Sequence, residues 1–148
     1  MSNYNVKIKK LKENAKIPTR GSKYAAGYDL YACINKNVII LPHETVKIGT
    51  GIAMNLPNGH FGAIFARSGL ATKQGLRPSN CVGVIDEDYT GELIVALHND
   101  TDEERIVIPN ERIAQLILIP YNTMTFEEVN ELDKTIRGDN GFGSTGNK

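Results

Sequence analysis

The residues best suited to chemistry lie in an acidic turn between two apolar runs. Residues 82–85 and 93–97 are apolar, and the turn between them reads D-E-D-Y-T-G from Asp86 to Gly91. β-Branched residues favour strands and Asp, Thr and Gly favour turns, so we predict a β-hairpin with carboxylates at its tip. An acidic turn is most often only a solvated loop. Tyr89 favours a binding site instead, because an exposed aromatic ring beside carboxylates offers its face to a ring-shaped partner.

A second candidate site combines an arginine with the start of a short helix. Residues 69–74 are the one helical stretch that we predict, with Ser68 as its N-cap and Gly75 as its C-terminal stop. The free N–H groups and the dipole at a helix N-terminus attract anions, and Arg67 stands directly before it. A phosphate contact and an ordinary capped turn are both open interpretations of this segment.

Two polar residues interrupt apolar strand patterns. Asp29 lies between Tyr28 and Leu30, and Gln115 lies inside the run I-A-Q-L-I-L-I. A buried carboxylate needs a charged partner or a cation, and a buried amide needs hydrogen-bond partners from the protein, water or a ligand. Each residue therefore has both a structural and a functional interpretation.

The C-terminal segment differs in composition from the rest of the chain. Residues 137–148 read R-G-D-N-G-F-G-S-T-G-N-K and contain four of the fourteen glycines. Such a segment cannot form a core and would be disordered when alone. Glycines also let backbone N–H groups converge on phosphate oxygens, Phe142 offers a face for a base, and Arg137 adds charge. We predict that residues 137–148 form a flexible nucleotide lid on a single domain of residues 1–136.

Short strands account for most of the remaining chain. Apolar or alternating runs recur from Val6 to Ile119, separated by turn signals such as Pro42, residues 49–51 and residues 57–59. The sequence has no periodic segment of helix length. This pattern predicts an all-β sandwich or barrel with one short helix.

Length and charge exclude several classes of protein. The chain of 148 residues has the size of one domain, and 17 basic residues balance 17 acidic ones to a net charge of zero. This total gives no support for binding nucleic acid or an anionic membrane. The N-terminus lacks a signal-peptide core and no apolar run approaches the about 18 residues of a membrane span, so we expect a soluble, cytoplasmic protein. Cys33 and Cys81 lack metal-site spacing, and we expect both to be buried and reduced.

Five segments, taken together, resemble the motifs of the homotrimeric dUTP pyrophosphatases (dUTPases). They occur in the family's order and span nearly the whole chain: A-G-Y-D-L (26–30), A-R-S-G-L-A (66–71), N-C-V-G-V-I-D-E-D-Y-T-G-E (80–92), E-R-I-A-Q-L (111–116) and R-G-D-N-G-F-G-S-T-G (137–146). Each segment alone is weak evidence, whereas their joint occurrence is specific. None departs from the family's pattern at the positions that matter.

The resemblance implies a fold, an assembly and a reaction. The subunit is expected to be a distorted jelly roll or β-barrel of the dUTPase β-clip type, and three subunits are expected to share three active sites. The family hydrolyses dUTP to dUMP and pyrophosphate, which lowers dUTP and supplies dUMP for thymidylate synthesis. We therefore expect dUTP as the substrate, a homotrimer, and Mg²⁺ as a cofactor that is bound through the triphosphate.

Matching positions imply roles at the reacting phosphorus, the sugar and the base. Asp86 matches the general base that orients water for attack on the α-phosphorus. Tyr89 matches the residue that packs against deoxyribose, where a 2′-hydroxyl would clash. The expected slot for uracil is formed by the main chain at Val84 and Ile85 and by Asn80, and it is too tight for the methyl group of thymine.

Further matches imply contacts to the phosphates and to the metal's water shell. The contacts implied on the barrel, all to the substrate, are Arg67, Ser68, Gly69, Gln115 and Ile94. Asp29 is expected to organise the water around Mg²⁺ without binding it directly. In the tail Phe142 is expected to stack on uracil, and the tail reaches a neighbouring subunit's site. The residues expected to close over the phosphates are Arg137, Gly143, Ser144 and Thr145.

Three alternatives differ in the reaction or in its absence. A dCTP deaminase on the same fold would release ammonia and needs a proton-shuttling group beside the base, whereas Asp86 and Tyr89 lie in the hydrolytic motif. A non-catalytic nucleotide-binding regulatory protein would bind dUTP without releasing pyrophosphate. A plain β-barrel interaction module leaves residues 137–146 unexplained. The full set of motif residues favours the hydrolase.

Overall fold

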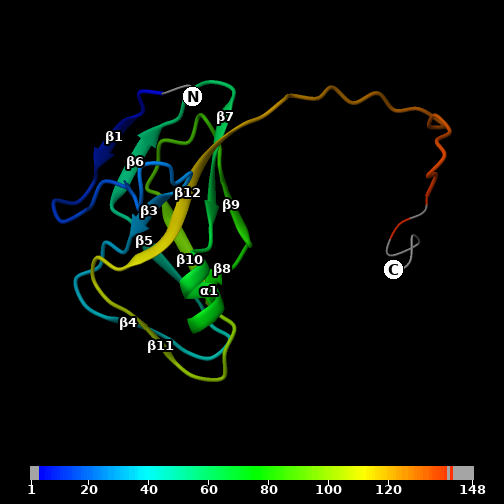
Figure 1. Cartoon of the computed structure of the whole chain (residues 1–148). Helices are drawn as coiled ribbons and strands as arrows, with labels where there is room; N and C mark the ends of the chain where they lie inside the picture. The colour runs from blue at the N-terminus through cyan, green and yellow to red at the C-terminus, as the bar shows by residue number, and fades with distance from the viewer. Residues whose placement is uncertain (1–3, 140, 142–148) are drawn as a thin grey trace.

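The computed structural model describes residues 4–139 and 141, and in this part of the chain it contains twelve strands and one helix. The elements are β1 (Lys7–Lys10), β2 (Thr19–Arg20), β3 (Tyr28–Tyr31), β4 (Val38–Ile40), β5 (Thr45–Gly49), β6 (Ile52–Asn55), β7 (His60–Phe65), α1 (Ser68–Gln74), β8 (Leu76–Pro78), β9 (Val82–Ile85), β10 (Ile94–Asn99), β11 (Arg105–Val107) and β12 (Arg112–Pro120). This architecture confirms the predicted all-β fold with a short helix (Figure 1).

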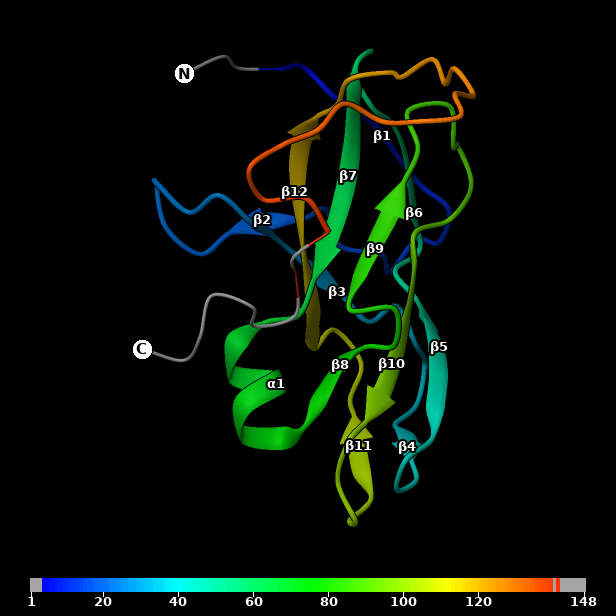
Figure 2. The ribbon, with the colours of Figure 1, turned by 90° about the vertical axis from the view of Figure 1, so that its right-hand side faces the viewer.

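The strands pair into antiparallel sheets in a jelly-roll-like arrangement. The largest sheet has the order β2-β3-β12-β7-β9, and a three-stranded sheet has the order β5-β10-β8. Two further pairs, β1 with β6 and β4 with β11, complete the sheets of the described residues. β12 lies between β3 and β7 at the centre of the largest sheet (Figure 2). Strands with one face on the core and one toward solvent explain the alternating runs of the sequence.

One hydrophobic core joins the sheets. The largest fully buried apolar side chains are Leu30, Ile40, Ile48, Ile52, Leu76, Leu93, Leu97 and Ile113. Burying each of these side chains stabilises the fold by about 1.5 to 3 kcal/mol. Because they come from strands of every sheet described, the core holds the separate sheets in one body.

The two apolar runs that flank the acidic turn, residues 86–91, do not pair as the predicted hairpin. β9 pairs with β7, whereas β10 pairs with β5 and β8. The Ser79 N–H donates to the Ala96 carbonyl over 2.8 Å, which extends the pairing of β10 with β8. Leu93 explains the divergence of the two runs, because its buried side chain and its 2.9 Å hydrogen bond to a β6 carbonyl draw the returning chain toward the other sheet. The acidic turn therefore crosses between two sheets.

The helix α1 begins one residue earlier than predicted, and its N-cap residue is Arg67 rather than Ser68. Arg67 has an extended backbone and no side-chain cap hydrogen bond, and Ser68 is the first helical residue. The Arg67 side chain is bound to Asp29 at 2.8 Å, so Arg67 belongs to the extended segment before the helix. The predicted stop is confirmed, since Gly75 ends the helix in the left-handed region at a φ of 65°.

The two cysteines differ in their exposure. Cys33 is buried, and its thiol lies 3.3 Å from Oδ1 of Asn14. Cys81 is exposed, so the prediction of two buried thiols is wrong for this residue. Cys81 has a φ of 62°, and this turn backbone directs its side chain outward, 3.8 Å from Nη1 of Arg77. Pro78, Ser79 and Asn80, which directly precede Cys81, favour a turn and were the available signal.

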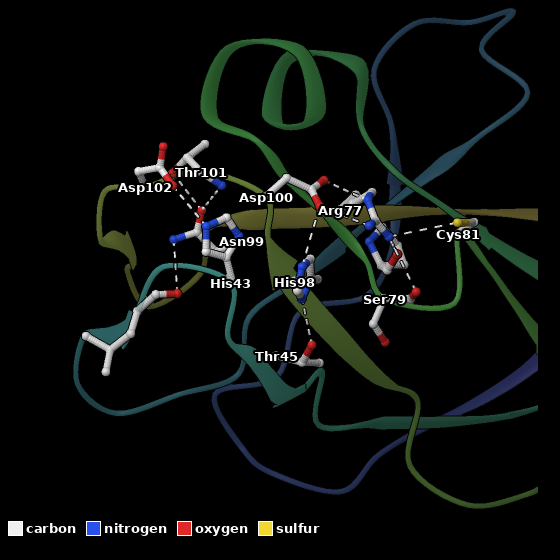
Figure 3. A network of polar contacts seen from close by, with 12 residues as sticks. His43, Thr45, Arg77, Ser79, Cys81, His98, Asn99, Asp100, Thr101 and Asp102 are labelled. Carbon is white, nitrogen blue, oxygen red and sulfur yellow. Dashed lines mark hydrogen bonds and ion pairs between the residues drawn. The ribbon is translucent and has the colours of Figure 1, made fainter.

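A buried asparagine joins several loops at one end of the barrel (Figure 3). Its Nδ2 donates to three carbonyls, at 3.1, 3.2 and 2.7 Å, which belong to Ile40, Leu41 and Glu103. Oδ1 of this residue, Asn99, accepts the N–H and the hydroxyl of Thr101 at 3.0 and 2.8 Å. Beside it Asp100 binds Arg77 through both carboxylate oxygens, and this hydrogen-bonded pair lowers the pKa of Asp100.

We predict that Asn99→Ala destabilises the protein, because five hydrogen bonds lose their partner in a buried site. The expected fall in the free energy of unfolding is about 2 to 4 kcal/mol, measured by urea denaturation. Asn122→Ala is the matched control, since Asn122 is exposed, and it should change that free energy by less than about 0.5 kcal/mol. Equal stabilities of the two variants would show that the network contributes nothing.

Residues 121–139 form an arm that leaves the barrel after β12 and runs away from it (Figure 1). The arm exposes large apolar side chains, with relative exposures of 85% at Phe126 and 86% at Leu132, and Ile136 is also exposed. Apolar side chains left uncovered along one segment mark a surface for contact with another molecule. In the described residues, no helix has the length and apolar character needed to span a membrane.

Candidate functional site

One end of the five-stranded sheet gathers the predicted phosphate contacts. Asp29 lies on β3, Gln115 lies on β12, Arg67 follows β7, and Ser68 and Gly69 begin α1. The strand register sets Asp29 beside Gln115, and Gln115 beside the last residue of β7. These five residues, called the arginine edge below, therefore come together from three elements.

Two arginines hold the carboxylate of Asp29. Nε of Arg67 lies 2.8 Å from Oδ1, and Nη1 of Arg112 lies 3.3 Å from Oδ2. The Asp29 side chain is 12% exposed, so burial requires such a partner, as the sequence suggested. Arg112 lies in a motif segment of the sequence but was not predicted as a site residue. Its position three residues before Gln115 was the available signal.

The amide of Gln115 is also fixed within the arginine edge. Its Nε2 donates to the Ala66 carbonyl over 2.9 Å, directly before Arg67. Gly27 allows this approach, because a Cβ at Gly27 would lie 2.5 Å from Oε1 of Gln115. The Gln115 side chain within β12 thus has a hydrogen-bond partner in the protein, and its amide oxygen lies near the chain segment before β3.

A cavity of about 500 Å³ opens beside the arginine edge. Its wall carries three cationic side chains and one carboxylate, which are Arg67, Lys73, Arg112 and Glu111. An excess of cations with N–H donors that point outward binds anions, and guanidinium groups suit phosphate oxygens in particular. This end of the sheet can therefore hold a polyanion.

The acidic turn lies at the other end of β9 and is anchored at both of its ends. Oε2 of Glu87 accepts the Gly59 N–H over 2.6 Å, and Oε1 of Glu92 accepts the Gly51 N–H over 2.8 Å. Asp86 is exposed on the wall of a cavity of about 630 Å³. An exposed carboxylate on a fixed turn can accept a proton from water.

Tyr89 packs back onto its own turn. Its hydroxyl donates to the Glu92 carbonyl over 2.9 Å, and the ring is 42% exposed. Gly91 lies under the ring, where a Cβ would come within 2.5 to 3.1 Å of three ring and hydroxyl atoms. The prediction of an exposed aromatic at this turn is confirmed, and Gly91 is the residue that lets the ring lie flat against the backbone.

The predicted base contacts follow β9, an edge strand. In the described residues β9 pairs only with β7, so alternate backbone groups of Val84 and Ile85 face away from the sheet. Val84 is 60% exposed, Ile94 is also exposed, and the Asn80 amide lies beside Gly83. Backbone donors and acceptors on an open strand edge can form hydrogen bonds with a base.

The two groups of site residues lie far apart within one chain. Asp29, Gln115, Phe65 and Val82 form one row across the sheet, and Asp86 follows four residues after Val82. Neighbouring strands lie about 4.8 Å apart, and a strand rises by about 3.3 Å per residue. The distance from Asp29 to Asp86 is therefore roughly 20 Å. Figure 2 shows the same separation, with α1 and the arrowhead of β9 at opposite ends of the sheet. The structure thus does not bring Asp86 and Arg67 together within one chain.

The predicted tail contacts are only partly described. Arg137 lies at the end of the described arm, where the Gly138 N–H donates to the Thr135 hydroxyl over 3.0 Å. The other tail residues with predicted roles lie outside the described residues, and they are Phe142, Gly143, Ser144 and Thr145.

The protein donors suit a metal that arrives with its ligand. Residues 4–139 and 141 contain no group of three or more His, Cys, Asp or Glu side chains that could hold a metal ion. Both oxygens of Asp29 already bind arginines. A divalent cation near the arginine edge would therefore draw most of its oxygen ligands from phosphates and water.

A further apolar groove lies elsewhere on the barrel. Its volume is about 500 Å³, and it is lined mainly by apolar and aromatic side chains such as Tyr4, Ile8, Ile17, Met54 and Leu118. None of the predicted site residues lines it. The arginine edge and the acidic turn, which carry the charged groups for anion binding and acid–base chemistry, are therefore the candidate site.

The fold and the site together define an all-β, jelly-roll-like protein with a cationic cavity and an open strand edge. The dUTPase family model matches residues 13–146. A deoxyuridine 5′-triphosphate nucleotidohydrolase of Syntrophotalea carbinolica is 42% identical over 146 residues, with 99% of each chain covered. One of the same name from Hydrogenobaculum is 45% identical over 141 residues, which cover 95% of this chain and 97% of the relative. The chain belongs to the dUTPase family.

Solved structures agree with this assignment. A mutant dUTPase of Staphylococcus bacteriophage 80alpha with dUpNHpp has a TM-score of 0.87 and 29% identity, and the match covers 97% of this chain and 99% of that one. A mutant dUTPase from phage phi11 of S. aureus, whose structure reveals the coordination of a structural Mg(II) ion, has a TM-score of 0.79 and 25% identity. That match covers 88% of this chain and 100% of the other.

We predict that Gly91→Ala displaces the Tyr89 ring, because a Cβ at this position overlaps it. The lost hydroxyl bond should lower the free energy of unfolding by about 1 kcal/mol. In NMR spectra with ¹³C-labelled tyrosine, the Tyr89 signal, assigned through Tyr89→Phe, should shift. Gly21→Ala is the control, since a Cβ there contacts nothing within 4 Å, and it should leave the signal in place. A Tyr89 signal unchanged by Gly91→Ala would refute the packing described.

Proposed function

We propose that this protein hydrolyses dUTP to dUMP and pyrophosphate. The family match supports the reaction class, and the observation that carries the proposal is the anchored acidic turn with Asp86 beside the open edge of β9. A base bound along this edge lies next to a carboxylate that can activate water. The arginine edge supplies the phosphate-binding groups that a nucleoside triphosphate requires.

Asp86 acts as the general base in this proposal. Its exposed carboxylate accepts a proton from a water molecule and orients that water toward the α-phosphorus. The water oxygen forms a bond to phosphorus, and the bond to the bridging oxygen breaks, so pyrophosphate leaves with the electron pair. Fixed donors at the phosphates stabilise the negative charge that develops.

Selection for dUTP depends on backbone groups and on exclusion. Main-chain groups at Val84 and Ile85, with the Asn80 amide, bind the uracil edge. Tyr89, held flat over Gly91, covers the deoxyribose and leaves no room for a 2′-hydroxyl. Such selection operates through clashes with the wrong nucleotides more than through added attraction to the right one.

The phosphates bind at the arginine edge. Arg67, Ser68 and Gly69 contact them, with Gln115 near the α-phosphate. Asp29 holds the Arg67 guanidinium in place and contributes to the water structure around the metal. Mg²⁺ bound through the triphosphate supplies charge neutralisation at the phosphate oxygens.

Each active site is shared between subunits of a homotrimer. The separation of roughly 20 Å between Asp29 and Asp86 supports this, because a base and an arginine must each lie within about 3 Å of the groups they contact. The Asp86 turn of one subunit therefore faces the arginine edge of another. The exposed apolar side chains of the arm support an assembly in which the arm crosses to a neighbour.

The tail acts as a lid in this assembly. Residues 137–148 close over the bound nucleotide, with Phe142 stacked on uracil. Arg137, Gly143, Ser144 and Thr145 provide donors to the phosphates. The direction of the arm, away from its own barrel, supports a lid on a neighbouring subunit (Figure 1).

We predict that Asp86→Asn lowers kcat for dUTP by at least about 100-fold, because the amide cannot accept the proton of water. Pyrophosphate release with Mg²⁺ measures the rate, and calorimetry with dUpNHpp measures binding. The affinity should change by less than about threefold, since the side chain keeps its size. Wild-type turnover in Asp86→Asn would rule out Asp86 as the base, and absence of pyrophosphate release by the wild type would reject the proposed function.

Removal of residues 137–148 should leave the barrel intact and abolish most of the activity. The lid excludes water and adds phosphate donors without contributing to the core, so kcat/KM should fall by about 100-fold or more while Tm changes by less than about 2 °C. The measurements are pyrophosphate release and thermal unfolding. Full activity of the truncated chain would contradict a role for the lid.

A further inference from the structure

Glu87 connects the acidic turn to two other segments. Its Oε2 accepts the Gly59 N–H over 2.6 Å, in the turn between β6 and β7. The phenol of Tyr121, the first residue of the arm, lies near the same carboxylate and lines the same cavity. The Tyr121 N–H in turn donates to the Gly59 carbonyl over 3.0 Å. Three segments that are distant in the sequence therefore meet at one side chain.

The charges that face Tyr121 are consistent with this contact. The hydrogen bond to Glu87 raises the pKa of Tyr121, and the nearby carboxylates of Glu87, Asp86 and Asp88 raise it further. These groups share one cavity wall, completed by Phe61 and Val84. The phenol is thus a proton donor placed among carboxylates, and it remains protonated because ionisation would add another negative charge.

Asp86 depends on its backbone for its position. In the described part of the chain its carboxylate accepts no hydrogen bond, and the Tyr89 N–H bond to the Asp86 carbonyl, at 3.1 Å, fixes only the local turn. Glu92 anchors the far end of the turn. Glu87, adjacent to Asp86, is the anchor at the near end, and it ties this end to β7 and to the root of the arm.

We propose that Glu87 is a positioning residue that fixes Asp86 for dUTP hydrolysis, through a clasp formed with Gly59 and Tyr121. This inference rests on the proposed function. Glu87 is half-buried at the surface and lies outside the hydrophobic core, so its removal spares the fold. A displacement of a reacting group by about 1 Å costs about 100-fold in rate, which gives the clasp a measurable effect.

The test compares steady-state kinetics of Glu87→Ala, Glu87→Gln, Asp88→Ala and Glu104→Ala with the wild type. Glu87→Ala should lower kcat by about 10- to 100-fold with KM changed less than threefold, because Asp86 acts on the water and not on substrate binding. Glu87→Gln should recover most of kcat, since its amide oxygen still accepts the Gly59 N–H. Asp88→Ala, in the same turn, should lower kcat less than Glu87→Ala does. Glu104→Ala is the control, since it removes an exposed carboxylate outside the turn, and it should behave as the wild type.

A spectroscopic measurement tests the clasp independently of activity. In ¹³C-tyrosine NMR titrations the wild type should show Tyr121, assigned through Tyr121→Phe, with a raised pKa. Glu87→Ala should lower this pKa toward the ordinary value, because both the hydrogen bond and the charge of Glu87 are removed. Asp88→Ala should lower it less.

The outcomes separate this inference from the proposed function. A wild-type protein that releases no pyrophosphate rejects the function itself. An active wild type with Glu87→Ala at full kcat, or with Tyr121 titration unchanged by Glu87→Ala, overturns the clasp. If Glu87→Ala unfolds, two other variants test the clasp. We expect kcat near the wild type for Glu87→Gln and a fall in kcat of about threefold or more for Tyr121→Phe. Full kcat in Tyr121→Phe with low kcat in Glu87→Gln would contradict the proposal.

Discussion

The antiparallel register of β7 and β9 is the constraint on which the rest of the site depends. Phe65 pairs with Val82, so the chain that leaves β7 toward Arg67 and the chain that leaves β9 toward Asp86 emerge at opposite ends of the sheet. A shift in this register would turn the buried face of β9 outward, and burial in the core prevents it. The fold thus holds the arginine edge and the acidic turn rigidly apart, and this favours a site assembled from more than one subunit.

The divergence of the chain after the acidic turn has a second consequence. A closed hairpin would pair the edges of β9 and β10 with each other and leave no backbone group for a ligand. Leu93 is buried and bound to β6, so the returning strand joins β5 instead. The outer edge of β9 stays available for hydrogen bonds. The features that stabilise the barrel therefore also create the surface on which base recognition is proposed.

The sequence predicts the composition of the site better than its geometry. The all-β class and the glycine stop of the helix follow from local rules of propensity and turn chemistry. Asp29 was expected to need a partner, but the identity of Arg67 and Arg112 as its partners depends on how β3, β12 and β7 align. The pairing of β9 with β7 was not predictable, because adjacent apolar runs favour a local hairpin and long-range pairing leaves no local signal. The exposure of Cys81 depends on a turn backbone with a φ of 62°, for which Ser79 and Asn80 were the available signal.

Complementation between two inactive variants tests the shared site most directly. Asp86→Asn lacks the base and Arg67→Gln lacks a phosphate contact, so each variant alone should be inactive. An equimolar mixture of the two variants is unfolded and reassembled. If the two residues act from different subunits, about a quarter of the resulting sites contain both wild-type residues. The account predicts pyrophosphate release from dUTP near about a quarter of the wild-type rate. A mixture no more active than its separate components would contradict a site shared between subunits.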